Sequence, residues 1–258
     1  MPVSLYHREY GTDGPAIVLL HGLFGSSANW GSIARELSGR YRVIVPDLRN
    51  HGQSPHVEDM GYPAMAGDVV ALCERLALDR PVIVGHSMGG KVAMCLALAQ
   101  ADGVRGLGVV DIAPVAYEHD FSIVLDAFEA VDLQTLQRRE QADQQMAAHL
   151  PDPRVRAFLL QNLVRDADGW HWRLNLAALR ANMSQITGFD CSGTGPYNGP
   201  TRFIHGNDSD YLLPDHHPRI RRLFPAAGFC PVADAGHWVY AEQRAGFMHC
   251  LEGLLEAI

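Results

Sequence analysis

The sequence predicts an α/β fold in which helices cover both faces of a mostly parallel central sheet. Short apolar runs recur along the first part of the chain, and stretches with helical spacing separate them. Each run is almost continuously apolar instead of alternating, as expected for a strand that is buried on both faces. An alternation of strands and helices is typical of a parallel sheet, because each parallel connection needs a crossover.

The elements follow this alternation as far as Pro114. The predicted strands lie at residues 16–22, 41–48, 81–87 and 106–114, and the predicted helices between them lie at residues 29–37, 63–76 and 90–99. Beyond Pro114 the spacing is helical only, from about Tyr117 to Ile186. One helix there is expected to begin with Asp152 as N-cap and Pro153 at its first position. The strand pattern resumes at residues 201–206 and 228–237.

This organisation predicts one sheet domain that is interrupted by a helical cap. We expect the sheet domain to comprise residues 1–116 and 188–258, and the cap to comprise residues 117–187. A chain of 258 residues, of which 47% are hydrophobic, is long enough to bury one large core with such an insertion.

Composition narrows the class of partner. A formal net charge of −8 argues against a nucleic acid or an anionic membrane, both of which attract clustered Lys and Arg, so we expect a small-molecule ligand. The five cysteines form an odd set without a CxxC pair, which indicates reduced thiols and a cytoplasmic protein. The N-terminus lacks the apolar region of a signal peptide, and no run approaches the ~18 apolar residues of a membrane span. No heptad pattern indicates an oligomeric state.

One serine stands in a sequence that favours nucleophilic chemistry. In GHSMGGK, Ser87 follows a predicted buried strand and precedes a predicted helix, with Gly85 and Gly89 two residues away on either side. A sharp strand-to-helix turn strains the residue at its apex and requires small neighbours to avoid collisions. Ser87 would then project beyond the sheet, beside backbone N–H groups such as that of Met88.

A serine hydroxyl needs a base, and the base needs an orienting carboxylate. His237 is the best candidate for the base, because it lies between the last predicted strand and the final helix. His86 adjoins Ser87 but is expected to point elsewhere, as a packing residue. A metal site is an alternative use of polar residues near the C-terminus, but their spacing matches no known ligand signature. Those residues are His205, Asp208, Asp210, His216 and His217.

Three aspartates remain as candidates for the orienting acid. Asp111, Asp208 and Asp210 all lie at predicted strand ends after Ser87 and before His237, so their order in the chain does not separate them. The oxyanion of an ester's tetrahedral intermediate needs two preorganised donors. The backbone N–H groups of Leu23, in HGLFG, and of Met88 are placed to supply them.

Several motifs together resemble a known family. HGLFGSSANW, PDLRNHGQSPH, GHSMGGKVAM, DIAPVAY and AGHWVYAE are similar to sequences of the α/β-hydrolase superfamily, and within it to a small esterase subgroup. The resemblance covers nearly the whole sheet domain and is weak in the cap. It implies an α/β-hydrolase fold with the cap inserted after the strand that follows the serine.

The resemblance also implies roles for individual residues. Ser87 would be the nucleophile, His237 the base, and the amides of Leu23 and Met88 the oxyanion hole. The subgroup places its acid in the DIAP context, which implies Asp111. Most of the superfamily places it where this chain has Ser209, between Asp208 and Asp210, and Ser209 would then be an auxiliary residue. The aromatic residues suggested for the acyl pocket are Phe24, Trp170, Trp172 and Trp238.

The predicted activity is hydrolysis of short- to medium-chain acyl esters through a Ser-His-Asp triad and an acyl-enzyme, without cofactor or metal. One alternative is an acyl-CoA thioesterase, for which basic residues in the cap would bind the CoA phosphates. The residues that suggest it are Arg154, Arg156 and Arg165. Further alternatives are C–C bond hydrolysis, cofactor-free perhydrolysis and a non-catalytic ligand-binding protein built on the same fold.

Overall fold

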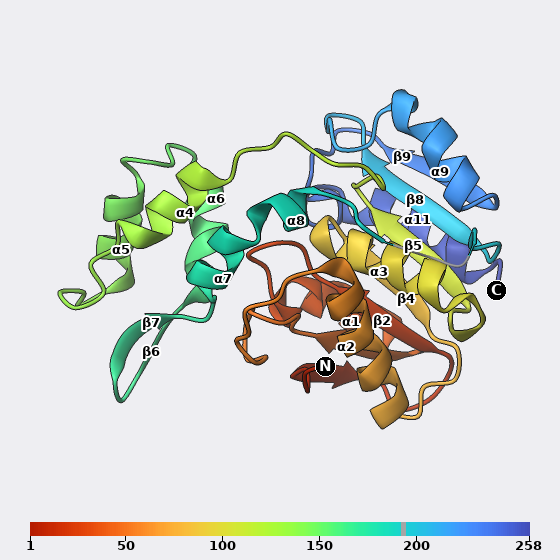
Figure 1. The fold of residues 1–258 in the computed structure, drawn as a ribbon, viewed down its shortest axis with the longest axis horizontal. Coiled ribbons are helices and arrows are strands. Elements are labelled where there is room, and N and C mark those ends of the chain that lie inside the picture. The colour runs from red at the N-terminus through yellow and green to blue at the C-terminus, as the bar shows by residue number, and fades with distance from the viewer. Residues whose placement is uncertain (192–194) are drawn as a thin grey trace.

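A seven-stranded sheet forms the centre of the protein in the computed structural model, which describes residues 1–191 and 195–258 (Figure 1). The strand order is β1-β3-β2-β4-β5-β8-β9. Only β1 runs antiparallel to its neighbour in this sheet, so the predicted α/β fold is confirmed. The strands are β1 (His7–Tyr10), β2 (Ala16–Leu20), β3 (Arg42–Pro46), β4 (Val82–His86), β5 (Gly106–Val110), β8 (Thr201–Gly206) and β9 (Ala227–Val232).

The central strands are buried on both faces. In β2, Ile17 and Leu19 pack into one apolar core, whereas Val18 and Leu20 pack into the other. Successive side chains of a strand point to opposite faces, so a strand between two cores must be apolar throughout. This explains why the predicted strands read as continuous apolar runs.

Helices cover the two faces. The helices of the sheet domain are α1 (Gly31–Leu37), α2 (Tyr62–Arg75), α3 (Met88–Ala99), α9 (His217–Leu223), α10 (Val239–Glu242) and α11 (Arg244–Leu255), with 3-10 turns η1 (Ser27–Trp30), η2 (Ala101–Gly103) and η4 (Pro214–His216). Figure 1 shows α2 and α3 on the near face and α11 behind the sheet. On the α11 face, the rings of Trp30 and Tyr240 stack with centroids 4.3 Å apart.

The segment between β5 and β8 forms the cap, a lobe that projects from one end of the sheet (Figure 1). Its helices are α4 (Ser122–Glu129), α5 (Arg139–Met146), α6 (Pro153–Leu159), η3 (Leu160–Asn162), α7 (Leu176–Ala181) and α8 (Met183–Thr187). As predicted, Asp152 is the N-cap of α6 and accepts a hydrogen bond of 2.8 Å from the N–H of Arg154. At the base of the cap, the N–H of Tyr117 donates to the carbonyl of Thr187 at 3.0 Å. The domain boundaries at 117 and 187 stay a prediction.

The expectation that the cap contains helices only is wrong. Strands β6 (Leu163–Asp166) and β7 (Gly169–Trp172) form an antiparallel hairpin. The Asp166 side chain accepts from the N–H of Asp168 at 2.9 Å across the turn, and Gly169 has a φ of 109°. An Asp-Gly pair flanked by aromatic and β-branched residues favours a hairpin over a helix, because glycine adopts this backbone freely.

The cysteines also differ from expectation. Cys230 in β9 and Cys250 in α11 form a disulfide, with Cα atoms 5.9 Å apart, so the expectation of reduced thiols is wrong for this pair. The pairing depends on the packing of α11 against β9, which spacing along the chain does not reveal. Cys73, Cys95 and Cys191 are free. The cytoplasmic location stays a prediction.

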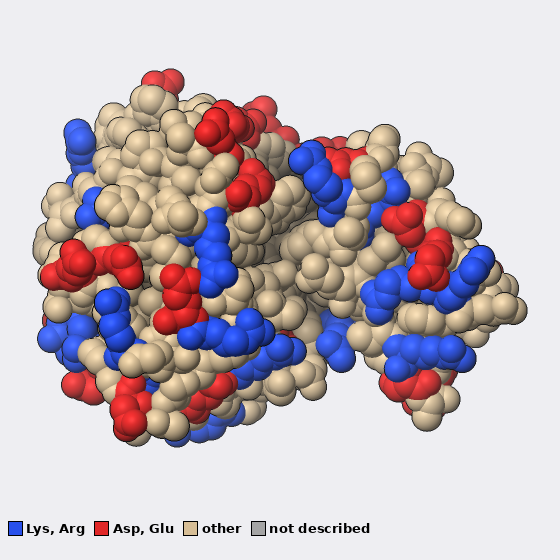
Figure 2. Space-filling view, turned by 180° about the vertical axis from the view of Figure 1, so that it is seen from behind, with Lys and Arg blue, Asp and Glu red and all other residues tan. Residues whose placement is uncertain are grey.

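The surface carries both signs of charge. Figure 2 shows acidic and basic side chains interspersed on one face, and a hollow between the larger lobe and the smaller lobe formed by the cap. Within residues 1–191 and 195–258, no helix is both long enough and apolar enough to cross a membrane.

Candidate active site

Ser87 occupies a strained turn between β4 and α3. Its φ is 52° and its ψ is −118°, which a residue with a side chain rarely adopts. A Cβ atom on Gly85 would lie 2.1 Å from the carbonyl oxygen of Gly89, and one on Gly89 would lie 2.5 Å from that of His21. Only glycine fits at these two positions. Gly85 and Gly89 are therefore required for the steric reason that the sequence indicated.

The structure brings His237 and Asp111 together. Nδ1–H of His237 donates to Oδ2 of Asp111 at 2.7 Å, and the carboxylate is fully buried. Two further donors contact this carboxylate: Ser209 Oγ at 2.5 Å from Oδ2, and the N–H of Gly206 at 3.1 Å from Oδ1. The parallel pairing of β5 with β8, in which Val110 lies opposite Ile204, places these groups side by side.

Burial shifts both members of this pair. It raises the pKa of Asp111 to about 6, although the hydrogen bond from Ser209 acts in the opposite direction. Burial also lowers the pKa of His237 to about 4. At neutral pH Asp111 is therefore ionised and His237 is a neutral imidazole, which is the state that can accept a proton.

His86 and Tyr211 each contact His237 in a way that the sequence did not predict. Nε2–H of His86 donates to the backbone carbonyl of His237 at 2.8 Å, so His86 holds this loop in addition to packing. The ring of Tyr211 stacks on the imidazole with centroids 3.9 Å apart and an angle of 21° between the rings. Tyr211 follows Ser209 by two residues, but no local pattern marks it.

Leu23, Ser87 and Met88 line one small cavity. Met88 is the first residue of α3, where the N–H groups of a helix are free to bind an anion. Leu23 follows β2, and the peptide group that carries its N–H is held through the carbonyl of Gly22. This carbonyl accepts from Nδ1–H of His21 at 2.8 Å and from the N–H of Gly25 at 3.0 Å. Both amides therefore belong to rigid backbone.

An apolar cavity of about 280 Å³ adjoins Ser87 and His237. Phe24 and Trp238 line it, as expected, together with five cap residues: Phe121, Val124, Val155, Phe158 and Leu159. A wider cavity of about 880 Å³ meets it at His237 and Trp238. The polar residues that line this outer cavity are Asn29, Arg154, Gln161, Asp234 and Glu242.

Other candidate residues lie apart from this cavity. Asp208 and Asp210 flank Ser209 but are exposed. Trp172 packs edge-to-face on Phe128 inside the cap, and Trp170 lies under the guanidinium of Arg165 in the hairpin. Among residues 1–191 and 195–258, no cluster of three or more His, Cys, Asp or Glu side chains could hold a metal ion.

Comparison with known proteins identifies the family. A family profile described as "alpha/beta hydrolase fold" matches residues 15–243. The chain belongs to the alpha/beta hydrolase fold family. Among curated alpha/beta hydrolases, it is 44% identical to the "sn-1-specific diacylglycerol lipase ABHD11" of Mus musculus, over 99% of this chain and 85% of that protein. It is 39% identical to "Esterase YbfF" of Escherichia coli (strain K12), over 93% of this chain and 92% of that protein.

Solved structures agree with the sequence relatives. The alpha/beta hydrolase described as "Marine microorganism esterase" superimposes with a TM-score of 0.94 at 34% identity, covering 99% of this chain and 100% of that one. The fold and the relatives together show that this alpha/beta hydrolase is an enzyme of the ester-hydrolysing class.

Proposed function

We propose that this protein is a serine carboxylester hydrolase that acts on short- to medium-chain acyl esters through Ser87, His237 and Asp111. The observation that carries the proposal is the 2.7 Å hydrogen bond from His237 to the buried carboxylate of Asp111. It fixes the imidazole with Nδ1 protonated, so that Nε2 is free to act as a base. Ser87 lines the same cavity as His237.

The proposed reaction has two halves. His237 takes the proton of Ser87 Oγ as that oxygen attacks the acyl carbonyl, and it then protonates the leaving alcohol. Water then attacks the acyl-enzyme while His237 again acts as base. This step releases the carboxylic acid product and regenerates Ser87. In both tetrahedral intermediates the amides of Leu23 and Met88 stabilise the oxyanion. Ionised Asp111 stabilises the imidazolium that forms in each half.

The inner cavity supports a limit on the acyl chain. An apolar cavity of about 150 Å³ holds one benzene ring, so a cavity of about 280 Å³ accommodates about ten carbon atoms. Its lining of Phe, Val and Leu side chains favours a hydrocarbon chain. The outer cavity is wider and more polar, which suits the alcohol part of an ester.

The cap arginines Arg154 and Arg156 give little support to a preference for CoA thioesters, and Arg165 lines neither the inner nor the outer cavity. Arg154 pairs with Asp152 at 2.9 Å, and two acidic residues, Asp234 and Glu242, line the same outer cavity. Arg156 pairs with Asp143 at 2.7 Å. A site for the CoA phosphates would require unpaired basic groups.

The test is the turnover of p-nitrophenyl esters from acetyl to palmitoyl, beside the matching CoA thioesters. We expect esters to be preferred, with an optimum at or below about ten acyl carbons and complete dependence on Ser87, checked with Ser87→Ala. Val124→Phe should shift the optimum to shorter chains, because Val124 lines the inner cavity. Ile123→Phe is the matched control, since Ile123 is 53% exposed.

Two results would contradict the proposal. Undiminished turnover by Ser87→Ala would exclude Ser87 as the nucleophile. A folded protein that neither turns over these substrates nor reacts with a fluorophosphonate would favour the non-catalytic binding protein.

A further inference from the structure

Phe24, which follows Leu23, is held through both of its backbone polar groups. Its N–H donates to Nε2 of His51 at 3.2 Å, and its carbonyl accepts from Nδ2 of Asn162 at 2.8 Å. His51 belongs to the loop after β3, and Asn162 belongs to η3 of the cap. Phe24 has a φ of 61°, a left-handed conformation that a bulky residue adopts only when its surroundings impose it.

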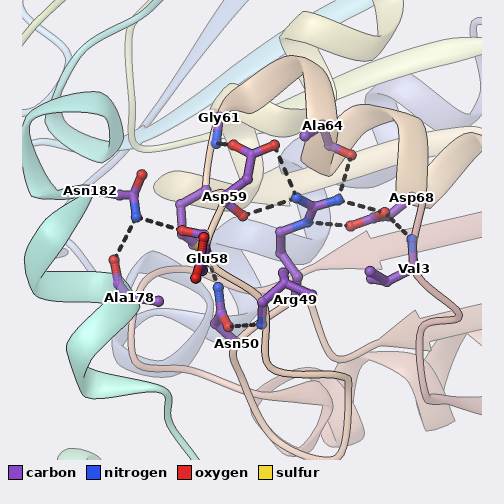
Figure 3. A network of polar contacts seen from close by, with 12 residues as sticks. Val3, Arg49, Asn50, Glu58, Asp59, Gly61, Ala64, Asp68, Ala178 and Asn182 are labelled. Carbon is purple, nitrogen blue, oxygen red and sulfur yellow. Dashed lines mark hydrogen bonds and ion pairs between the residues drawn. The ribbon is translucent and has the colours of Figure 1, made fainter. Parts of the chain in front are cut away.

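His51 is fixed as an acceptor. Its Nδ1–H donates to the carbonyl of Arg49 at 2.9 Å, so Nε2 carries the lone pair that receives the N–H of Phe24. Burial lowers the pKa of His51 to about 3, which keeps the ring neutral. Arg49 itself is anchored by two hydrogen bonds to Asp68, of 2.6 and 2.8 Å, and by one of 2.9 Å to the carbonyl of Asp59 (Figure 3).

Asn162 is held equally well. It is 3% exposed, and its amide nitrogen also donates to the carbonyl of Leu159 at 3.0 Å. Its backbone carbonyl accepts from the N–H of Arg173 at 2.9 Å. Because both amide protons have acceptors and the backbone is tied to the segment after the hairpin, the cap presents this donor to Phe24 in one orientation.

These contacts bear directly on Leu23. Its N–H shares a peptide group with the Gly22 carbonyl, which accepts from two donors, and the next two peptide groups are held through the N–H and the carbonyl of Phe24. Peptide groups are planar and rigid, so fixing the groups before and after Leu23 sets the direction of its N–H. Catalysis is sensitive to such placement, since a misplacement of about 1 Å can lower a rate about a hundredfold.

We propose that His51 and Asn162 are positioning residues of the oxyanion hole, so that the cap contributes to catalysis through its bond to Phe24 as well as by enclosing the acyl chain. This inference rests on the proposed function, in which the amide of Leu23 binds the oxyanion. It assigns to the cap a part in transition-state stabilisation that is independent of acyl-chain length.

Asn162→Ala tests the cap contact, and Asn182→Ala is the matched control. Asn182 is a second buried cap asparagine, whose amide nitrogen donates to the carbonyls of Glu58 and Ala178 at 2.8 Å (Figure 3). It is not one of the two side chains that hydrogen-bond to the backbone of Phe24. We expect Asn162→Ala to lower kcat about tenfold by the same factor for acetyl and longer esters, with KM nearly unchanged. Affinity for a trifluoromethyl ketone, which forms a tetrahedral adduct, should fall by the same factor. Asn182→Ala should change each value less than about twofold.

His51 is tested by a variant and its rescue. His51→Ala removes the acceptor and should lower kcat about tenfold, whereas His51→Gln supplies an amide oxygen and should restore most of the rate. A loss that grows with acyl-chain length in Asn162→Ala would show that Asn162 shapes the pocket, and would overturn the inference. Equal kcat values in His51→Ala and the wild type would also overturn it.

Amide hydrogen exchange tests whether the backbone around Phe24 is held by these residues, and this measurement does not depend on enzyme activity. Amide exchange in the peptide covering residues 20–30 should be faster in Asn162→Ala and His51→Ala than in the wild type or Asn182→Ala. If turnover does not depend on Ser87 while exchange accelerates as expected, the proposed function fails. The conclusion that His51 and Asn162 hold the backbone of Phe24 is then still supported. Unchanged exchange in both variants would overturn the inference whatever the enzyme's activity.

Discussion

Ser209 donates a hydrogen bond of 2.5 Å to Oδ2 of Asp111, the same carboxylate oxygen that accepts from His237. A hydrogen bond to the charged form of an acid stabilises that form and lowers its pKa, which opposes the effect of burial on Asp111. Ser209 thus helps to keep Asp111 ionised at the pH where His237 must act as a base. The two groups titrate as a pair, so activity should be lost in acid between about pH 6 and about pH 4.

Ser209→Ala should shift this acid limb to higher pH. Without the hydroxyl, the pKa of Asp111 rises further, and a protonated Asp111 no longer stabilises the imidazolium. We expect kcat/KM to fall about threefold to tenfold at pH 6 and less at pH 8. The pH profile of ester hydrolysis measures this, with the exposed Ser32→Ala as control. Superimposable profiles for Ser209→Ala and the wild type would exclude this role.

Asp111→Asn should lower kcat about 10⁴-fold, because the amide would leave His237 in the wrong tautomer. Asp208→Asn and Asp210→Asn should stay within about threefold of the wild type, since both residues are exposed and lie outside the buried network. Steady-state kinetics on one ester compares the three variants. A loss confined to Asp208→Asn or Asp210→Asn would transfer the role of acid to that residue.

Asp68→Ala should lower the free energy of unfolding by about 3–5 kcal/mol, because it removes the buried counter-ion of Arg49 and leaves the guanidinium only the exposed carboxylate of Asp59, 3.5 Å away. The side chains of Asp68 and Arg49 are 1% and 2% exposed. Glu129→Gln, which removes an exposed partner of Arg180, should cost less than about 1 kcal/mol. Urea unfolding of both variants measures the two losses in free energy of unfolding. Similar losses would show that the buried Arg49–Asp68 pair contributes no more than an exposed ion pair.

Lys91 should titrate near neutral pH. It is the only lysine in the sequence, is 1% exposed, and donates to the carbonyls of Thr187 and Gly188 at 2.8 and 2.5 Å. Burial lowers the pKa of Lys91 from 10.5 to about 7. Protein labelled with ¹⁵N-lysine gives a single Nζ signal whose titration measures this value directly. A midpoint at the ordinary lysine value would contradict the prediction.

The lowered pKa of Lys91 also determines the direction in which this residue changes the free energy of unfolding with pH. Between about pH 7 and about pH 10 the unfolded chain keeps a proton on Lys91 that the folded protein has released, so this group makes unfolding less favourable as pH rises. The stability of the wild type relative to Lys91→Met should therefore increase from pH 7 to pH 9 in urea unfolding. Parallel pH dependences of the two proteins would show that Lys91 remains charged when folded.

The sequence by itself determined the elements whose signals are local. The continuous apolar runs indicate strands buried on both faces, Asp152 and Pro153 mark the start of α6, and the glycines around Ser87 mark a turn that only small residues allow. Each signal lies within a few neighbouring residues, because side-chain periodicity, capping and steric exclusion act over that range. The hairpin at residues 163–172 also has a local signal in the Asp168-Gly169 pair, but the helical spacing around it masked that signal.

The tertiary structure alone decided which distant groups meet. The register of β5 against β8 places Asp111 beside Gly206 and Ser209, whereas chain order left three aspartates equivalent. The packing of α11 on β9 joins Cys230 to Cys250. The bond from Asn162 to Phe24 spans 138 positions. Such contacts depend on strand register and on the docking of the cap, which are set by burial summed over the whole core and are not encoded near any one residue.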